Sequence, residues 1–188
     1  MIFQVDGALD AAACRRLCDI YDRHRERAQI TDYSGFPVLH WWDFETAPEI
    51  DHMMRVLMKQ TQDRIVGFLP ELAPIYPETL FLAYLGPGGC HPRHADNSEQ
   101  REDGSWRPNH TPERDVSALY YLNDDFEGGE IVFEQHGLSI KPHAGLLVIF
   151  PSDRHHVHEV LPITAGKRYS VQTWYTRQKD CALAGALP

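Results

Sequence analysis

The spacing of apolar positions divides the chain into a helical first part and a strand-rich second part. In residues 8–27 the apolar positions recur every three or four residues, at Leu9, Ala13, Leu17 and Ile20. This period predicts an amphipathic helix, which Asp6 or Asp10 caps. A second helix is predicted from Pro48, a residue type favoured in the first turn of a helix. Its apolar positions, which we interpret as core, are Ile50, Met53, Met54, Leu57, Met58 and Ile65.

From residue 78 onward the pattern changes to short strands. The segments are rich in β-branched and aromatic residues and are bounded by Gly, Pro, Asn or Asp. They are TLFLAYL, DVSALYYL, GEIVF, GLSI, GLLVIF and the run from His155 to Tyr175. Gly128 and Gly129 are predicted to form a tight hairpin turn. We therefore expect an α+β, mainly β fold: a double-stranded β-helix (a cupin-like jelly roll) buttressed by N-terminal helices.

One domain is expected over residues 1–188, with residues 1–75 as helical support and residues 76–178 as the jelly-roll core. A chain of 188 residues, 43% of them hydrophobic, is long enough to bury one such core. Residues 97–114 are polar, contain two prolines and form the one long irregular stretch. Because long loops in compact domains are often functional, we interpret this stretch as a lid, with a plain exposed loop as the alternative.

Composition narrows the range of partners. The net charge of −9 argues against nucleic acid, whose phosphates require clustered Lys and Arg. No stretch approaches the roughly 20 apolar residues of a membrane span, and the first residues lack the pattern of a signal peptide. Four cysteines without C-x-x-C spacing are interpreted as reduced thiols. We therefore expect a cytoplasmic protein that binds neither nucleic acid nor membrane.

Candidate chemistry begins at HPRHADN, residues 91–97. If this run is a strand, His94 and Asp96 point to the same face, because side chains alternate along a strand. An imidazole and a carboxylate that converge in this way are typical of a divalent-metal site. The third ligand is expected downstream in RHHVHEV, which contains His155, His156 and His158.

The pattern of the final strand-like run helps to choose the third ligand among these histidines. In KRYSVQTWY, alternation places four side chains on one face, namely Arg168, Ser170, Gln172 and Trp174. If His158 lies across from that face, the metal and a guanidinium line one pocket. Two His and one carboxylate form the facial triad of non-haem iron(II) oxygenases. Arg168 is then placed to bind the far carboxylate of a 2-oxo acid in a bidentate manner.

With these residues in view, the chain from Leu82 to Thr176 resembles the 2-oxoglutarate- and iron(II)-dependent prolyl hydroxylase family. The matching segments are YLGPGGCHPRHADN, ALYYLNDDFEGGEIVF, GLLVIFPSD and HEVLPITAGKRYSVQTWY. HADN together with DVSALYYLNDDFEGGE is most similar to leprecan-type prolyl 3-hydroxylases. HEV and the final WY are similar to oxygen-sensing prolyl hydroxylases. The helical first third matches only in general layout.

The resemblance implies a role for each matching residue. His94, Asp96 and His158 are implied as Fe(II) ligands, and Arg168 as the partner of the 2-oxoglutarate C5 carboxylate. Three further residues are implied near the cosubstrate, namely Tyr121, Tyr84 and Ser170. Trp174 is implied to line the pocket. For Tyr84, Tyr121 and Trp174 the alternative is ordinary core packing, and His91, His155 and His156 are interpreted as solvated or supporting residues.

The reaction implied by the resemblance is hydroxylation of a C–H bond. The enzyme would consume O2 and 2-oxoglutarate, release succinate and CO2, and use ascorbate as a reductant. A prolyl residue in a protein or peptide is the family's usual substrate. A free amino acid or a natural-product intermediate is the first alternative, and a non-catalytic jelly-roll binding protein is the second.

Two related enzyme classes fit less well. Nucleic-acid dealkylases place a second Arg six residues after the first, where this chain has Trp174. A cupin dioxygenase with three histidine ligands uses an H-x-H pair where this chain has His94 and Asp96. The segments expected to determine specificity are the loop at 97–114 and the aromatic stretch at 33–44. Trp41, Trp42 and Trp106 are candidates for a substrate wall, with packing roles as the alternative.

Overall fold

The structure, a computed structural model, describes residues 1–30, 36–40 and 48–183. Trp41 and Trp42, and with them much of the aromatic stretch, lie outside the described residues. Helices α1 (Ala11–His24) and α2 (Pro48–Phe68) form where the apolar period predicts them. Asp10 caps α1, accepting a hydrogen bond of 2.8 Å from the backbone N–H of Ala13. Short 3-10 turns occur at Arg25–Arg27, Pro70–Leu72, Glu134–His136, Arg154–His156 and Lys179–Cys181.

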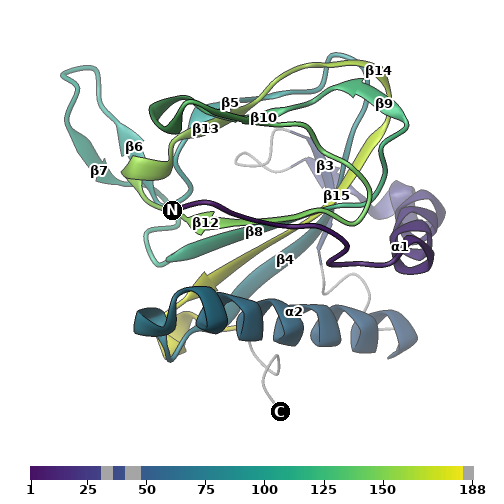
Figure 1. The fold of residues 1–188 in the computed structure, drawn as a ribbon, viewed down its shortest axis with the longest axis horizontal. Coiled ribbons are helices and arrows are strands. Elements are labelled where there is room, and N and C mark those ends of the chain that lie inside the picture. Colours follow the sequence, from purple (N-terminus) through teal and green to yellow (C-terminus); the bar gives the residue numbers. More distant parts are fainter. Residues whose placement is uncertain (31–35, 41–47, 184–188) are drawn as a thin grey trace.

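Two antiparallel sheets face each other and form the jelly roll (Figure 1). The larger sheet has the order β1 (Phe3–Val5), β12 (Leu147–Pro151), β8 (Val116–Tyr121), β15 (Arg168–Thr176), β4 (Tyr76–Leu85), β3 (Pro37–His40) and β2 (Gln29–Ile30). The smaller sheet has the order β11 (Leu138–Ile140), β10 (Ile131–Phe133), β13 (His158–Val160) and β5 (His91–His94). Two further pairs are β14 (Ile163–Gly166) with β9 (Phe126–Gly128), and β6 (Ser98–Gln100) with β7 (Trp106–Pro108).

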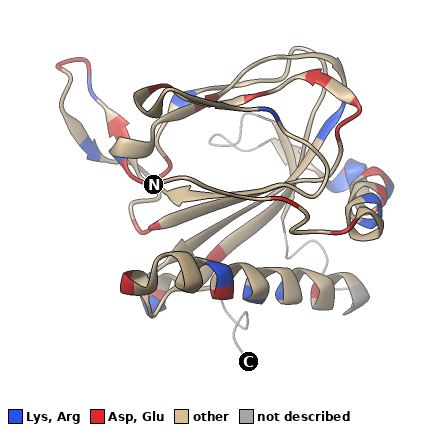
Figure 2. Cartoon of the chain, in the orientation of Figure 1, with Lys and Arg blue, Asp and Glu red and all other residues tan. Residues whose placement is uncertain are grey.

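The main core lies between the larger sheet and the two helices. Leu17 and Ile20 of α1 and Met54 and Met58 of α2 are buried against it, and α2 runs across the outer face of the sheet (Figure 1). Charged residues gather on the helices and loops, whereas the strands of the larger sheet are mostly uncharged (Figure 2). In the part of the chain that the structure describes, neither helix has the length and apolar character needed to cross a membrane.

The expected division of the chain at residue 76, into helical support and a jelly-roll core, holds only in part. Strands β1, β2 and β3 precede this position, yet all three belong to the larger sheet. Phe3 pairs with Ile149 of β12, and Val38 pairs with Ala83 of β4. The first part of the chain therefore supplies sheet edges as well as helical support.

The predicted hairpin turn at Gly128 and Gly129 is wrong. Strand β9 pairs with β14, whereas β10 pairs with β11 and β13, so the glycines join two different sheets. Both have positive φ angles, of 75° and 71°. A Cβ on Gly128 would lie 2.2 Å from the carbonyl oxygen of Pro162. The close approach of the backbone, rather than a two-residue turn, explains why glycines occupy these two positions.

Two local predictions near the proposed site also need correction. Strand β5 ends at His94, so Asp96 lies in the bend that follows it and not on a common strand. Residues 97–114 are not one irregular loop, because they contain the β6–β7 hairpin, in which Ser98 pairs with Pro108. This hairpin projects from one end of the barrel (Figure 1).

Candidate active site

A pocket lies between the two sheets, and both contribute side chains to it. From the larger sheet, the pocket face of β15 presents Arg168, Ser170, Gln172 and Trp174, as the alternation predicted. The neighbouring strand β8 presents Leu119 and Tyr121. The smaller sheet and the bend after it present His94, Asp96, Ile131, His158 and Val160. Residues far apart in the chain therefore meet in one enclosed site.

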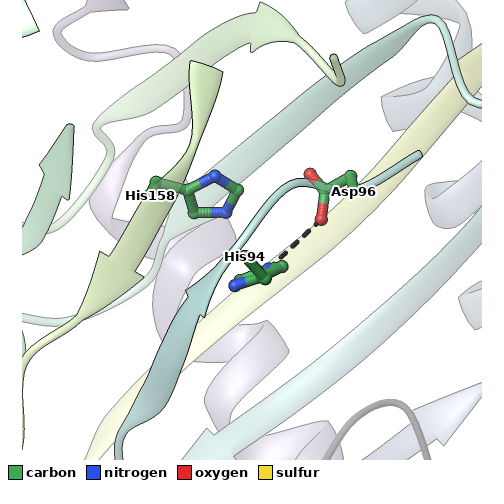
Figure 3. A group of neighbouring side chains, drawn as sticks. All are labelled: His94, Asp96 and His158. Carbon is green, nitrogen blue, oxygen red and sulfur yellow. Dashed lines mark ion pairs between the residues drawn. The ribbon is translucent and has the colours of Figure 1, made fainter. Parts of the chain in front are cut away.

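His94, Asp96 and His158 converge in this pocket (Figure 3). His94 and His158 are directly paired across β5 and β13. The Nε2 atom of His94 lies 3.3 Å from Oδ1 of Asp96, and one ligand atom from each of the three residues lies within 4.8 Å of the others. Among the described residues, this is the one group of at least three His, Cys, Asp or Glu side chains with such spacing.

Both imidazoles are oriented by backbone carbonyls. Nδ1 of His94 donates to the carbonyl of Pro92 at 2.7 Å, and Nδ1 of His158 donates to the carbonyl of His156 at 3.0 Å. Since the carbonyls can only accept, these bonds place the proton on Nδ1 and leave the Nε2 lone pair for a metal.

The electrostatic surroundings favour the ligating forms of Asp96 and His158. Burial and the proximity of His94 lower the pKa of His158 to about 3, so its imidazole is neutral. Burial opposes ionisation of Asp96. Even so, the close contact with Nε2 of His94, the nearby His158 and the Ser117 hydroxyl together hold the Asp96 pKa below its usual value. A carboxylate and a neutral imidazole are the forms that bind divalent iron.

Ser117 is a supporting residue that the sequence reading missed. Its hydroxyl donates to Oδ2 of Asp96 and contacts Oγ of Ser152 at 2.8 Å. Oδ2 is therefore hydrogen bonded, whereas Oδ1 lies beside Nε2 of His94. The strand pattern alone contained a usable signal, because Ser117 is a polar residue within the apolar run of β8.

Arg168 and Tyr121 form the other end of the pocket. Arg168 is only 2% exposed, and its Nη1 donates to the carbonyl of Gly129 at 2.9 Å. No acidic side chain among the described residues pairs with it, and its Nε and the Tyr121 hydroxyl lack hydrogen-bond partners there. Burial lowers the pKa of Arg168 and raises that of Tyr121. Ser170 is buried beside them, since it pairs with Tyr121 across the strands.

These unpaired atoms fit the expected cosubstrate. A buried guanidinium and a buried phenol without acceptors are costly unless an anionic group binds them. A carboxylate satisfies both, and a planar guanidinium matches its geometry. The pocket thus combines three metal-ligand atoms at one end with donors for a carboxylate at the other.

The predicted position of Tyr84 beside the cosubstrate is wrong. Tyr84 pairs with Tyr169 across β4 and β15, and both belong to the face opposite Arg168 and Ser170. There Tyr84 stacks on Tyr21 of α1, with ring centroids 5.6 Å apart. Its offset from His94 resembled that of the family, but strand alternation assigns it to the helix-facing core.

The remaining candidates separate into pocket residues and supporting residues. His91 lines the pocket and lies against His94, with ring centroids 4.0 Å apart. His156 is buried and hydrogen bonded to Asp153 at 2.8 Å, and His155 is exposed. Trp106 lies on β7 and does not line this pocket.

The C-terminal part of the 97–114 segment is tied to the metal-binding bend. Asn109 Nδ2 and Thr111 Oγ1 both donate to the backbone carbonyl of Asp96, at 3.1 Å and 2.8 Å. Asn109, His110 and Thr111 also line the pocket. This segment is therefore a wall of the site, whereas its hairpin extends away from it.

Comparison with known proteins agrees with this geometry. The profile of the 2OG-Fe(II) oxygenase superfamily matches residues 79–176, more than half of the chain. Human prolyl 3-hydroxylase 2 is 42% identical over 94 residues, which cover 46% of this chain but only 13% of the human protein. A PKHD-type hydroxylase of Pseudomonas putida is 26% identical over 184 residues, covering 93% of this chain and 77% of that protein.

A solved structure extends the similarity to the fold. The crystal structure of a Pseudomonas putida prolyl-4-hydroxylase matches with a TM-score of 0.69 and 25% identity, covering 94% of this chain and 92% of the other. The family's name states its cofactor chemistry, which is Fe(II), 2-oxoglutarate and O2. The matched region, residues 79–176, contains the convergent His94, Asp96 and His158 together with the buried Arg168. The chain therefore belongs to the 2OG-Fe(II) oxygenase superfamily.

Proposed function

We propose that this oxygenase hydroxylates a prolyl residue in a protein or peptide. The observation that carries the proposal is the pairing, in one pocket, of a three-residue metal group with a buried Arg168 that lacks an acidic partner among the described residues. The similarity to the prolyl hydroxylases named above supports the substrate class.

In this proposal His94, Asp96 and His158 hold Fe(II). Arg168 binds the C5 carboxylate of 2-oxoglutarate, with Tyr121 and Ser170 as additional hydroxyl donors. Bound Fe(II) and 2-oxoglutarate would activate O2, of which one oxygen atom enters a C–H bond of the substrate and the other enters succinate, with release of CO2. The chain's own contribution is to orient both imidazoles, keep Asp96 ionised and exclude water from the Arg168 end.

The charge of the pocket favours a peptide over a free amino acid. Among the described lining residues Asp96 is the one acid, and Ser117 and His94 already engage its oxygens. A free amino acid carries an ammonium group that would need a carboxylate partner on burial. A prolyl residue within a peptide has a neutral tertiary amide and makes no such demand.

A succinate-release screen tests this function. Prolyl peptides, free amino acids and metabolites are supplied separately with Fe(II) and 2-oxoglutarate, and mass spectrometry detects the gain of one oxygen. We expect turnover with prolyl peptides and its loss in Asp96→Ala. Oxygen gain confined to free amino acids would contradict the proposed substrate class, and unchanged activity in Asp96→Ala would contradict the metal site.

We also propose that ascorbate serves as a reductant for the iron. The protein is further proposed to be cytoplasmic. All four cysteines are free thiols, which is typical of a reducing compartment. Ascorbate is expected to prolong turnover in the succinate assay, and the location is tested by fractionation of the producing cell.

A further inference from the structure

Trp174 marks the end of the pocket opposite Arg168. The two lie six positions apart on β15, which corresponds to about 20 Å along a strand. Across the adjacent strand Trp174 pairs with Ser117, the residue that donates to Asp96. Trp174 therefore lies level with the metal group, beyond the part of the pocket assigned to 2-oxoglutarate.

The indole of Trp174 is held by a buried cation. The guanidinium carbon of Arg114 lies 4.0 Å from the ring centroid of Trp174. Trp174 is 6% exposed and Arg114 is 5% exposed, and both line the pocket. The indole N–H has no hydrogen-bond partner among the described residues. Its ring plane is thus set by packing and by the cation, not by a hydrogen bond of its own.

Glu78 fixes the guanidinium in turn. Nε of Arg114 donates to Oε2 of Glu78 at 3.0 Å, in an ion pair shielded from solvent. Because a buried cation without a counter-charge is strongly unfavourable, Arg114 has one well-defined position between the carboxylate and the indole.

An irregularity in the sheet gives Glu78 this position. In the pairing of β4 with β15, Trp174 lies opposite Thr79 and Tyr175 lies opposite Pro77, so Glu78 is left without a partner on β15. An extra residue of this kind bends the strand and redirects a side chain. The redirected side chain here is the carboxylate that meets Arg114, directly beside Trp174.

We propose that Glu78 is a positioning residue for the substrate end of the site: through Arg114 it fixes the plane of the Trp174 indole, against which the substrate's prolyl segment packs. This inference rests on the proposed function. Glu78 touches neither cosubstrate nor metal in this arrangement, since it is absent from the pocket lining. Its loss should therefore weaken peptide binding and leave 2-oxoglutarate binding intact.

The first test is steady-state turnover of Glu78→Gln with poly(L-proline) as the peptide probe. We expect the KM for poly(L-proline) to rise at least tenfold, and a larger fraction of 2-oxoglutarate to be consumed without oxygen gain in the peptide. The affinity for 2-oxoglutarate, from an anaerobic titration of the Fe(II) charge-transfer band, is expected to stay within twofold. Glu134→Gln is the matched control, because Glu134 is exposed and pairs with Arg93 at 3.6 Å.

A second measurement does not depend on turnover. The near-UV circular dichroism of Trp174 is obtained by subtracting the spectrum of Trp174→Phe, in the wild-type background and in each variant background. We expect this difference signal to fall by more than half in Glu78→Gln and to persist in Glu134→Gln. If Glu78→Gln alone does not fold, Glu78→Asp, which keeps the charge but shortens the side chain, replaces it in both experiments.

The outcomes separate the two proposals. An unchanged Trp174 signal, or an unchanged KM for poly(L-proline), overturns the role of Glu78. A wild-type protein that binds no 2-oxoglutarate and oxidises no prolyl peptide overturns the proposed function, while the dichroism still decides whether Glu78 positions the indole.

Discussion

At the scale of single residues, the pocket contains buried side chains that lack hydrogen-bond partners until a ligand binds. The Tyr121 hydroxyl is buried, lines the pocket and has no hydrogen-bond partner among the described residues. A buried polar group in this condition costs stability, so its removal is neutral or slightly stabilising in the absence of ligand. Ligand binding should reverse the sign of that effect.

Tyr121→Phe is therefore expected to preserve the free energy of unfolding without ligand, within about 0.5 kcal/mol, and to weaken 2-oxoglutarate binding about tenfold. Urea denaturation and the charge-transfer titration measure the two quantities. Arg168→Lys, which lacks the planar fork of guanidinium, should weaken binding more strongly. A stability loss of several kcal/mol in Tyr121→Phe with unchanged affinity would show that the hydroxyl has a structural role instead.

Ser117 supports the metal group from behind Asp96. In Ser117→Ala the carboxylate loses its hydrogen bond to Oδ2 and with it an orienting contact. Residues in this position typically contribute about 10- to 100-fold to metal affinity, so we expect a loss in this range when Fe(II) or Mn(II) binding is titrated anaerobically. Ser139→Ala, at an exposed position of β11, is the control. Equal affinities in the two variants would contradict the supporting role.

The site residues that could be predicted from the sequence either lie close together along the chain or match the motif of a known family. His94 and Asp96 are two positions apart, and Arg168 begins a strand whose alternation is readable. Tyr84 was misplaced because a fixed offset along the chain carries no information about which face of β4 it occupies. Ser117 was missed because its role depends on the contact between β8 and the bend after β5, which are not adjacent in the sequence.

At the scale of elements, the connection between β9 and β10 passes close to the backbone of Pro162, which lies between β13 and β14. Gly128 and Gly137 both have positive φ angles, of 75° and 57°. A Cβ on Gly128 would collide with the backbone of Pro162, whereas a Cβ on Gly137 would meet no atom within 4 Å. Substitutions at the two glycines therefore distinguish the free-energy cost of a positive φ angle from the cost of a steric clash.

Gly137→Ala is expected to cost about 1–2 kcal/mol, the penalty of a left-handed conformation. Gly128→Ala pays the same penalty and must also displace the Pro162 carbonyl, so we expect a total loss above about 3 kcal/mol. Denaturant midpoints of both variants measure the difference. Similar losses in the two would contradict the close approach and would restore a simple turn as the role of Gly128.

Elements with a long, regular apolar period were predictable, and elements defined by their partners were not. Helices α1 and α2 follow from their own sequences because each buries one face. Strand β10 has an equally clear pattern, but the pattern does not state that its neighbours are β11 and β13 rather than β9. The β6–β7 hairpin was hidden for a related reason, since its exposed polar strands lack an apolar alternation.

At the scale of the whole molecule, metal and cosubstrate binding should act as one event. The metal group and Arg168 line the same pocket from opposite sheets, so a molecule that bridges them ties the two sheets together. Ligands that bind only the folded protein stabilise it, by about 2.7 kcal/mol at a concentration 100-fold above Kd. For a chain of this size that corresponds to a rise in Tm of about 5–10 °C.

We therefore expect Mn(II), an air-stable substitute for Fe(II), and 2-oxoglutarate together to raise Tm by more than the sum of their separate effects in a thermal-shift experiment. EDTA should remove the gain. In Asp96→Ala the metal loses its carboxylate ligand, and in Arg168→Ala the cosubstrate loses its cation, so each variant should abolish the excess by a different route. Purely additive shifts in the wild-type protein would mean that the two ligands bind independently, and that the pocket does not hold them in contact as its geometry requires.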